Sequence, residues 1–224
     1  MLSCLTVLVY FNNIFLLSLC KPAHVTVRDS NNYSRNNQYV TCGSVVKLMN
    51  VDYRVRLHSH DVKYGTGSGQ QSVTGTEVKE DVNSHWIIKA PTGKTCKRGE
   101  PIKCNDIIRL THTTTNKNLH SHHFSSPLSG AQEVSAYGKE GEGDTGDHWR
   151  VMCDSDYWER KDGAGIEPTY LSATRQTYGR PISGQYEIVT VSWPDHNPVL
   201  WKTMEGIFIH PSDPVANSHV HTEL

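Results

Sequence analysis

The sequence lacks an excess of charge of either sign. Its 224 residues contain 22 Lys and Arg against 23 Asp and Glu, a formal net charge of −1. A surface that attracts nucleic acid needs a basic field, and no acidic run is long enough to dominate either. We therefore expect no nucleic acid among the partners of this protein.

Helical periodicity is also scarce. Nowhere do apolar residues recur at i, i+3, i+4 and i+7 through three turns. Short apolar runs, such as 45–48 and 55–57, are instead separated by Gly, Pro, Asn and Ser, which is typical of strands and turns. With 17 Gly, 10 Pro and 36% hydrophobic residues, the chain is turn-rich but globular. The sequence predicts an all-β fold.

Catalytic and cofactor motifs are missing as well. The glycines at 65–69 favour a turn, because a dinucleotide fingerprint needs a helix after it and none is predicted. The segment 65–70 also lacks the strand–turn–helix context of a nucleophile elbow. The acidic run at 140–147 lacks the residue order of an EF-hand loop, so we expect a solvated loop there. We predict no enzymatic activity and no cofactor.

The two ends of the chain resemble targeting signals. The first 20 residues hold no charged side chain and resemble a secretory signal peptide, although the usual basic start is absent. An uncleaved signal-anchor is the alternative, because the run nearly reaches the ~20 residues that span a bilayer. The last four residues resemble the HDEL retrieval address, with Thr in place of Asp: His221, Thr222, Glu223 and Leu224. Together these signals predict the endoplasmic reticulum lumen.

The flanking segments are predicted to be polar and exposed. We assign 1–20 to the signal peptide, 21–40 to a polar N-terminal segment and 211–224 to a flexible tail. Asn32 begins an Asn-Tyr-Ser glycosylation acceptor in the polar segment. A luminal location would allow this residue to carry a glycan.

Four cysteines follow the signal segment: Cys42, Cys96, Cys104 and Cys153. An oxidising compartment favours two disulfides, for which three connectivities exist. A zinc site would need closer pairs such as C-x₂-C, and none is present. We favour the pairs Cys96–Cys104 and Cys42–Cys153, with buried free thiols as the alternative.

One phrase of the sequence is repeated. LHSH at 57–60 recurs at 119–122, SG at 68–69 recurs at 129–130, and HW at 85–86 recurs at 148–149. These offsets of 61–63 residues indicate one copied unit. A more diverged third copy follows, with LS at 171–172 and YGRPISGQYEIV at 178–189.

Each unit closes with a tryptophan, Trp86, Trp149 or Trp201, which we predict to be a core residue. Trp158 and Trp193 stand outside the repeat and are candidates for exposure. Three units of about four short strands predict a closed β-trefoil, in which closure removes exposed strand edges. The predicted units are 41–95, 96–153 and 154–210.

The histidines of the repeated phrase are candidates for ligand or partner contact: His58, His60, His120, His122 and His123. Residues i and i+2 share one face of a strand, so His58 and His60 are placed to bind one ligand together. Asp61 points to the other face, and no third metal ligand stands out. We favour a structural role, in which His and Ser hydrogen-bond at a strand end and hold the glycine-rich turn, and we assign no metal.

The three units, with LHSH, SGQQSVTG and SPLSGAQEVSAYG, the closing tryptophans and the HDEL-like tail, resemble the stromal cell-derived factor 2 family, whose members contain three MIR motifs. The resemblance covers about 170 residues. It implies a β-trefoil without catalytic activity that works with the luminal DnaJ-type co-chaperone and the Hsp70 chaperone BiP. Misfolded proteins would be its clients, in protein quality control and the response to unfolded proteins.

A lectin-like module is the alternative function. Trefoils often carry sugar sites, and protein O-mannosyltransferases contain MIR motifs, so binding of mannosyl or other glycans is the rival hypothesis. An exposed aromatic ring beside polar side chains would favour it.

Overall fold

The computed structural model describes residues 24–25, 38–138, 143–152, 158–160, 169–195 and 197–209. The predicted signal peptide, Asn32, Cys153 and the C-terminal tetrapeptide lie outside the described residues. Within the described ranges the regular structure is nearly all β, with two short 3-10 segments, which confirms the predicted fold class. No helix of this part of the chain is long and apolar enough to cross a membrane.

Four strands are described in each of the three units. The first contains β3 (Val45–Asn50), β4 (Arg56–Lys63), β5 (Gln71–Thr76), η1 (Val82–Ser84) and β6 (Trp86–Lys89). The second contains β7 (Ile107–His112), β8 (Asn118–Ser125), β9 (Gln132–Tyr137), η2 (Thr145–Asp147) and β10 (Trp149–Val151). The third contains β11 (Trp158–Arg160), β12 (Thr169–Thr177), β13 (Tyr186–Val191) and β14 (Trp201–Ile207). A separate pair is formed by β1 (His24–Val25) and β2 (Gln38–Tyr39).

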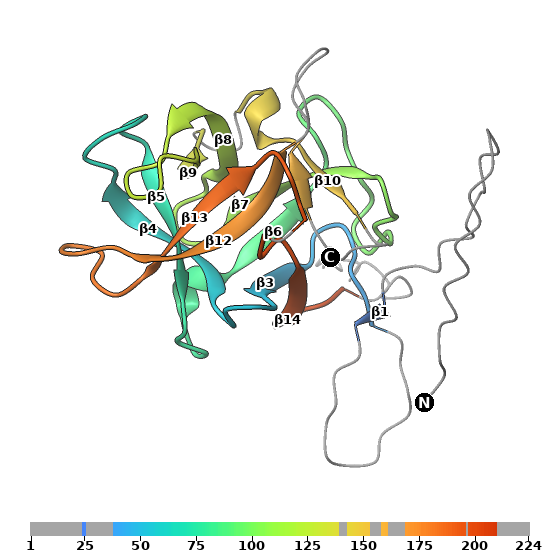
Figure 1. Cartoon of the computed structure of the whole chain (residues 1–224). Helices are drawn as coiled ribbons and strands as arrows, with labels where there is room; N and C mark the ends of the chain where they lie inside the picture. Colours follow the sequence, from blue (N-terminus) through green and yellow to red (C-terminus); the bar gives the residue numbers. More distant parts are fainter. Residues whose placement is uncertain are drawn as a thin grey trace, which may run out of the picture.

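The strand pairing is that of a β-trefoil (Figure 1). The first and fourth strands pair within units 1 and 2, as β3–β6 and β7–β10, and across unit boundaries, as β6–β7, β10–β11 and β14–β3. The second and third strands form the hairpins β4–β5, β8–β9 and β12–β13. The three hairpins meet through β5–β9, β9–β13 and β13–β5 pairs. Every unit is therefore held by both of its neighbours.

The closing tryptophans occupy equivalent core positions. Trp86 and Trp149 have no exposed surface, and Trp201 is 3% exposed. In each unit the indole Nε1 donates to a backbone carbonyl at 2.9 Å: Trp86 to Leu57, Trp149 to Leu119, and Trp201 to Leu171. These leucines are also fully buried, so the same contact anchors each hairpin to the fourth strand of its unit. The predicted core role of the three tryptophans is confirmed.

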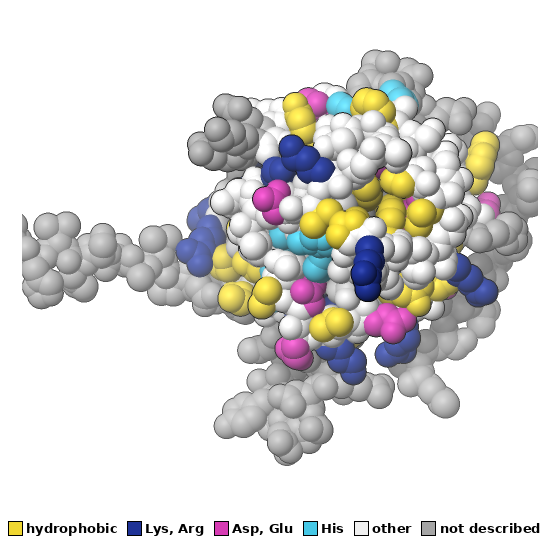
Figure 2. All heavy atoms as spheres, turned by 90° about the vertical axis from the view of Figure 1, so that its left-hand side faces the viewer, with side chains coloured by type: hydrophobic (Ala, Val, Ile, Leu, Met, Phe, Trp, Pro, Cys, Tyr) yellow, Lys and Arg dark blue, Asp and Glu magenta, His cyan; other side chains and the backbone are white. Residues whose placement is uncertain are grey.

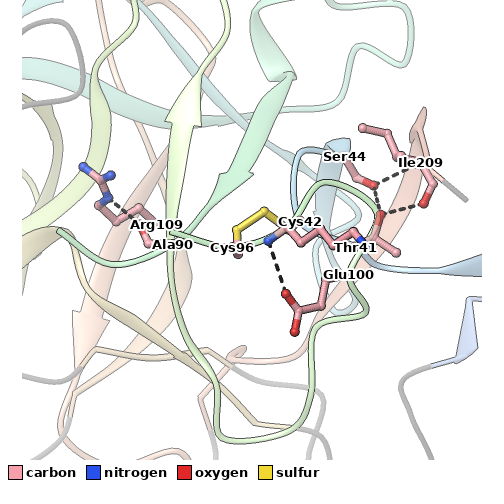
Figure 3. The surroundings of a disulfide bond; sticks show 9 residues. Thr41, Cys42, Ser44, Ala90, Cys96, Glu100, Arg109 and Ile209 are labelled. Atoms are coloured by element: carbon pink, nitrogen blue, oxygen red, sulfur yellow. Dashed lines mark hydrogen bonds between the residues drawn. A yellow bond between two sulfur atoms is a disulfide. The ribbon is translucent and has the colours of Figure 1, made fainter. Parts of the chain in front are cut away.

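The predicted disulfide pairing is wrong. Cys42 is bonded to Cys96, with a Cα–Cα distance of 6.1 Å, which excludes both Cys96–Cys104 and Cys42–Cys153 (Figure 3). Cys104 is also disulfide-bonded. Backbone pairing brings the first two together, because the Cys42 amide donates to the Glu100 carbonyl at 2.8 Å. A short loop between nearby cysteines suggested a bridge, whereas the fold places the segment around Cys96 beside the start of unit 1.

The end of unit 3 is tied to the start of unit 1. Thr41 Oγ1 donates to the Ile209 carbonyl at 2.7 Å, and the Ile209 amide donates to Ser44 Oγ at 3.0 Å (Figure 3). Together with the β14–β3 pairing, these bonds close the circle of units.

Candidate functional site

The first histidine phrase forms a chain of hydrogen bonds on β4. His58 is buried, and its Nδ1 lies 2.6 Å from Oδ2 of Asp81. Its Nε2 lies 2.7 Å from Nδ1 of His60, which is half-buried. Asp81 caps η1, and its carboxylate also accepts from Ser84 Oγ and from the Asn83 amide. The chain therefore attaches η1 to the β4–β5 hairpin.

Burial and charge set the protonation of this cluster. Burial raises the pKa of Asp81, but the hydrogen bond from His58 and further hydrogen bonds outweigh burial and lower that pKa to about 2. Burial, followed by the charge of His58, lowers the pKa of His60. Burial lowers the pKa of His112, which packs on Trp86, to about 4. At neutral pH Asp81 is therefore ionised and His112 is neutral.

The second histidine phrase builds a different network on β8. His120 is fully buried, and its Nδ1 lies 2.8 Å from Oδ1 of Asp147, which is also fully buried. Asn118 Nδ2 donates to the other oxygen of Asp147 at 3.0 Å. Asp144, the cap of η2, lies 3.7 Å from His120 Nδ1 and 3.4 Å from His122 Nε2. Two carboxylates thus face two histidines.

The expectation of a solvated loop at 140–147 is wrong for Asp147. This carboxylate is buried because His120 and Asn118 satisfy its two oxygens, as a buried charged group requires. Glu140 and Glu142 lie outside the described residues.

The serines of the repeated phrase form structural hydrogen bonds, but not with the glycine-rich turn that we predicted they hold. Ser59 Oγ donates to the Ser72 carbonyl at 2.8 Å, and Ser121 Oγ donates to the Glu133 carbonyl at 2.7 Å. Each bond joins the two strands of one hairpin, β4–β5 or β8–β9. In unit 3, Ser172 is buried in place of the first histidine. Histidine and serine therefore hold the hairpins and the 3-10 segments rather than the glycine-rich turn.

The glycine-rich segment does form a turn, as predicted. Gly67 and Gly69 both have φ of +66°, a conformation that other residues rarely adopt. A Cβ on Gly67 would also collide with the carboxylate of Glu133, which accepts from the backbone amide of Ser68 at 3.3 Å. The turn of unit 1 is thus packed against β9 of unit 2.

A pocket of about 570 Å³ lies between the tip of the β4–β5 hairpin and the end of β9. Tyr137 lines it, is 41% exposed, and packs on the ring of His120 with centroids 4.8 Å apart. Gln71 also lines it, and its buried Oε1 has no hydrogen-bond partner within the described ranges. Further polar lining side chains are Lys63, Gln70, Lys117 and Asp144.

The structure brings the predicted histidines together in two pairs. His58 lies against His60, and His120 lies against His122 with ring centroids 4.1 Å apart, whereas His123 is exposed. Figure 2 shows histidine side chains gathered near the middle of one face, with hydrophobic side chains around them. Trp193 is 71% exposed, as expected, and the side chain of Trp158 lies outside the described part.

Sequence reasoning missed the carboxylates that complete these pairs. Asp81 and Asp144 are separated by 63 residues, the same offset that relates His85 to His148, so the repeat itself contained the signal. Nothing local in the sequence distinguishes either residue from a loop acid. Tyr137 was missed as well, although it is the last residue but one of the second repeated phrase.

Comparisons with known proteins identify a matching domain family and relatives of similar sequence. Residues 38–180 match the MIR domain family. Stromal cell-derived factor 2 of Bos taurus is 54% identical over 195 residues, which cover 85% of this chain and 92% of that protein.

Solved structures agree with this relationship. The crystal structure of the SDF2-like protein from Arabidopsis thaliana has a TM-score of 0.72 at 38% identity and covers 78% of this chain and 99% of that one. A part of the S. cerevisiae protein O-mannosyltransferase complex bound to the sugar donor has a TM-score of 0.65 at 24% identity, covering 82% of this chain and 29% of that one. The latter likeness shows the fold alone.

Proposed function

Because this chain belongs to the stromal cell-derived factor 2 family of MIR-domain proteins, we propose that it is a non-enzymatic component of a chaperone complex in the endoplasmic reticulum lumen. Its partners in this proposal are a DnaJ-type co-chaperone and BiP, and its clients are misfolded proteins. The sequence identity of 54% over 85% of the chain is the observation that carries the proposal, because the family resemblance implies a role in such a chaperone complex. Protein quality control and the response to unfolded proteins are the processes it would serve.

Four exposed apolar side chains near β3 or on its partner strand β14 are candidates for contact with other proteins. Val78 and Val82 are 59% and 69% exposed and flank Lys79, whose carbonyl accepts from Lys47 of β3. Met204 and Ile207, which are 37% and 71% exposed, lie on β14, the partner strand of β3. Exposed apolar side chains that form one patch commonly mark a site of protein contact. We propose that these four residues form such a patch and call them the β14 surface.

We expect charge on the β14 surface to weaken binding of the co-chaperone. The double substitution Met204→Asp and Ile207→Asp would place two carboxylates in an apolar contact, and a central contact residue is worth more than about 1 kcal/mol. The affinity for the purified DnaJ-type luminal co-chaperone should fall by at least about tenfold in calorimetric titration. The matched control is Phe124→Asp on β8, a residue 45% exposed, which should bind like the unmodified protein.

Two results would contradict this assignment. Equal affinity of the double variant and the unmodified protein would remove the β14 surface from the contact. Absence of binding between the unmodified protein and the co-chaperone would overturn the proposed complex itself.

Glycan binding is the second candidate, and the pocket beside Tyr137 is the observation that favours it. A partly exposed aromatic ring lies among amide, ammonium and carboxylate side chains there, which would offer a sugar one ring to stack on and several groups to hydrogen-bond. The two candidates separate in one competition experiment with the co-chaperone. Binding that survives excess mannose and enzymatic removal of the partner's glycans supports the chaperone role, whereas displacement by mannose supports the lectin.

The location is part of the proposal and has its own test. Removing His221 to Leu224 should release the protein into the culture medium, because a receptor reads such an address. The measurement is the ratio of secreted to retained protein in cells that express the full chain or the truncated chain. Retention of the truncated chain would favour a signal-anchor, or a partner that holds the protein in the cell.

A further inference from the structure

Unit 2 brings three metal-ligand side chains together at one place. Ligand atoms of His120, His122 and Asp144 all lie within 4.8 Å of one another. His120 and His122 come from β8, and Asp144 caps η2, so the hairpin and the following 3-10 segment each contribute to the group. It is the only group of three or more such side chains in the described ranges.

A single difference between the repeats explains why the group forms in unit 2. In unit 1 the capping carboxylate of Asp81 is bonded directly to His58, and Ser84 also donates to that carboxylate. The residue equivalent to Ser84, 63 positions further along, is Asp147. Asp147 takes over the bond to His120, at 2.8 Å, and leaves the capping Asp144 facing His122.

The bond to Asp147 also prepares His120 as a ligand. Its Nδ1 lies against the Asp147 carboxylate, while its buried Nε2 has no hydrogen-bond partner in the part of the chain that is described. Histidines that bind metals typically donate one ring N–H to a carboxylate, which fixes the tautomer and makes the other nitrogen more basic. An unpartnered buried nitrogen is costly in a fold that satisfies most of its polar groups, and a metal ion would satisfy it. Nε2 is therefore the proposed ligand atom, because Nδ1, which lies 3.7 Å from Asp144 Oδ1, is already bonded to Asp147.

The spacing of the other two ligands fits a small divalent ion. His122 Nε2 and Asp144 Oδ1 are 3.4 Å apart. Zinc binds nitrogen and oxygen at about 2.0–2.2 Å, which places two ligands of a tetrahedral site about 3.3–3.6 Å from each other. The Gly146 amide donates to Asp144 Oδ1 at 2.7 Å and so orients this carboxylate.

We propose that His120, His122 and Asp144 bind one divalent transition-metal ion, with Asp147 as the carboxylate that orients His120. Two imidazoles and one carboxylate are a donor set suited to Zn²⁺ and its neighbours rather than to Ca²⁺ or Mg²⁺, which prefer oxygen ligands. Asp144 also lines the pocket beside Tyr137, so the ion would lie at the pocket edge with a coordination position open to it. This site goes beyond the proposed chaperone role and does not depend on it.

Titration of the untagged full-length mature protein with Zn²⁺, after chelator treatment, tests the site. We expect one zinc ion per chain in calorimetry, a rise in the melting temperature, and a Co²⁺ spectrum of a four-coordinate nitrogen and oxygen site. Asp144→Asn and His122→Gln should each weaken Zn²⁺ binding more than about tenfold, because each removes one of three protein ligands. Asp147→Asn should weaken it by about 10–100-fold, as loss of a group that orients a ligand does.

Matched controls come from the repeat and from the same strand. His60→Gln changes the residue of unit 1 equivalent to His122, and His123→Gln changes the exposed neighbour of His122. Both should bind Zn²⁺ like the unmodified protein, and all variants should keep the circular dichroism spectrum of the metal-free protein. The proposal is overturned by absence of Zn²⁺ binding, by unchanged binding in Asp144→Asn and His122→Gln, or by an equal loss in the two controls.

Discussion

Replacement of Trp86, Trp149 or Trp201 by alanine is expected to lower the free energy of unfolding by about 3–5 kcal/mol in each case. Each indole is at least nine-tenths buried in the shared core and donates to the backbone of its own hairpin. Alanine removes the packed ring and also leaves a buried leucine carbonyl without its donor, which adds to the cost. Urea denaturation followed by circular dichroism measures the change.

Trp193→Ala is the control, because this side chain is 71% exposed and a surface change of this kind shifts stability by about 0.5 kcal/mol or less. Replacement by phenylalanine is a milder change, since it keeps an aromatic ring but removes the indole donor and part of the buried ring volume. Its cost should lie between that of alanine and that of the control. A closing tryptophan whose alanine variant is as stable as Trp193→Ala would contradict its core role.

Loss of the Cys42–Cys96 bond is expected to cost about 4 kcal/mol. The bond joins residues 54 positions apart, and a loop of this length restricts the unfolded chain strongly. The double variant Cys42→Ala and Cys96→Ala should therefore unfold at a clearly lower urea concentration than the unmodified protein. The native backbone pairing between Cys42 and Glu100 remains available to the variant, so we expect it still to fold.

Peptide mapping without reduction provides the direct check of this pairing. It should recover Cys42 linked to Cys96, and alkylation of the unreduced protein should label neither residue. A stability loss below about 1 kcal/mol in the double variant would show that the link adds little to the native state. A recovered Cys96–Cys104 peptide would instead restore the pairing that sequence spacing favours.

The fold was largely predictable because the same sequence pattern occurs three times in the chain. A repeated pattern of short strands, closed by Trp86, Trp149 and Trp201, indicates three units that must bury the same surface. Core positions are set by the local hydrophobic pattern and by its repetition, and both can be read directly from the sequence. The trefoil, the buried tryptophans and the glycine turn at Gly67 and Gly69 all follow from such local signals.

The polar partners were not predictable in the same way. His58 and His120 occupy equivalent positions in the sequence, yet one is bonded to Asp81 and the other to Asp147. Which aspartate is bonded to the histidine depends on which carboxylate the 3-10 segment after the hairpin places beside the imidazole ring. Burial of Asp147 likewise depends on His120 and Asn118 being present to satisfy it.

The sequence by itself determined the all-β class, the three units and the residues that close them, because these depend on local pattern and repetition. Only the tertiary structure decided the Cys42–Cys96 bond, the grouping of His120 and His122 with Asp144, and the pocket beside Tyr137. Each of these joins segments that are separated along the chain and become neighbours through strand pairing or through the 3-10 segments. The positions of these residues in the sequence do not show that they are in contact, because the closed arrangement of the three units determines which loops are neighbours.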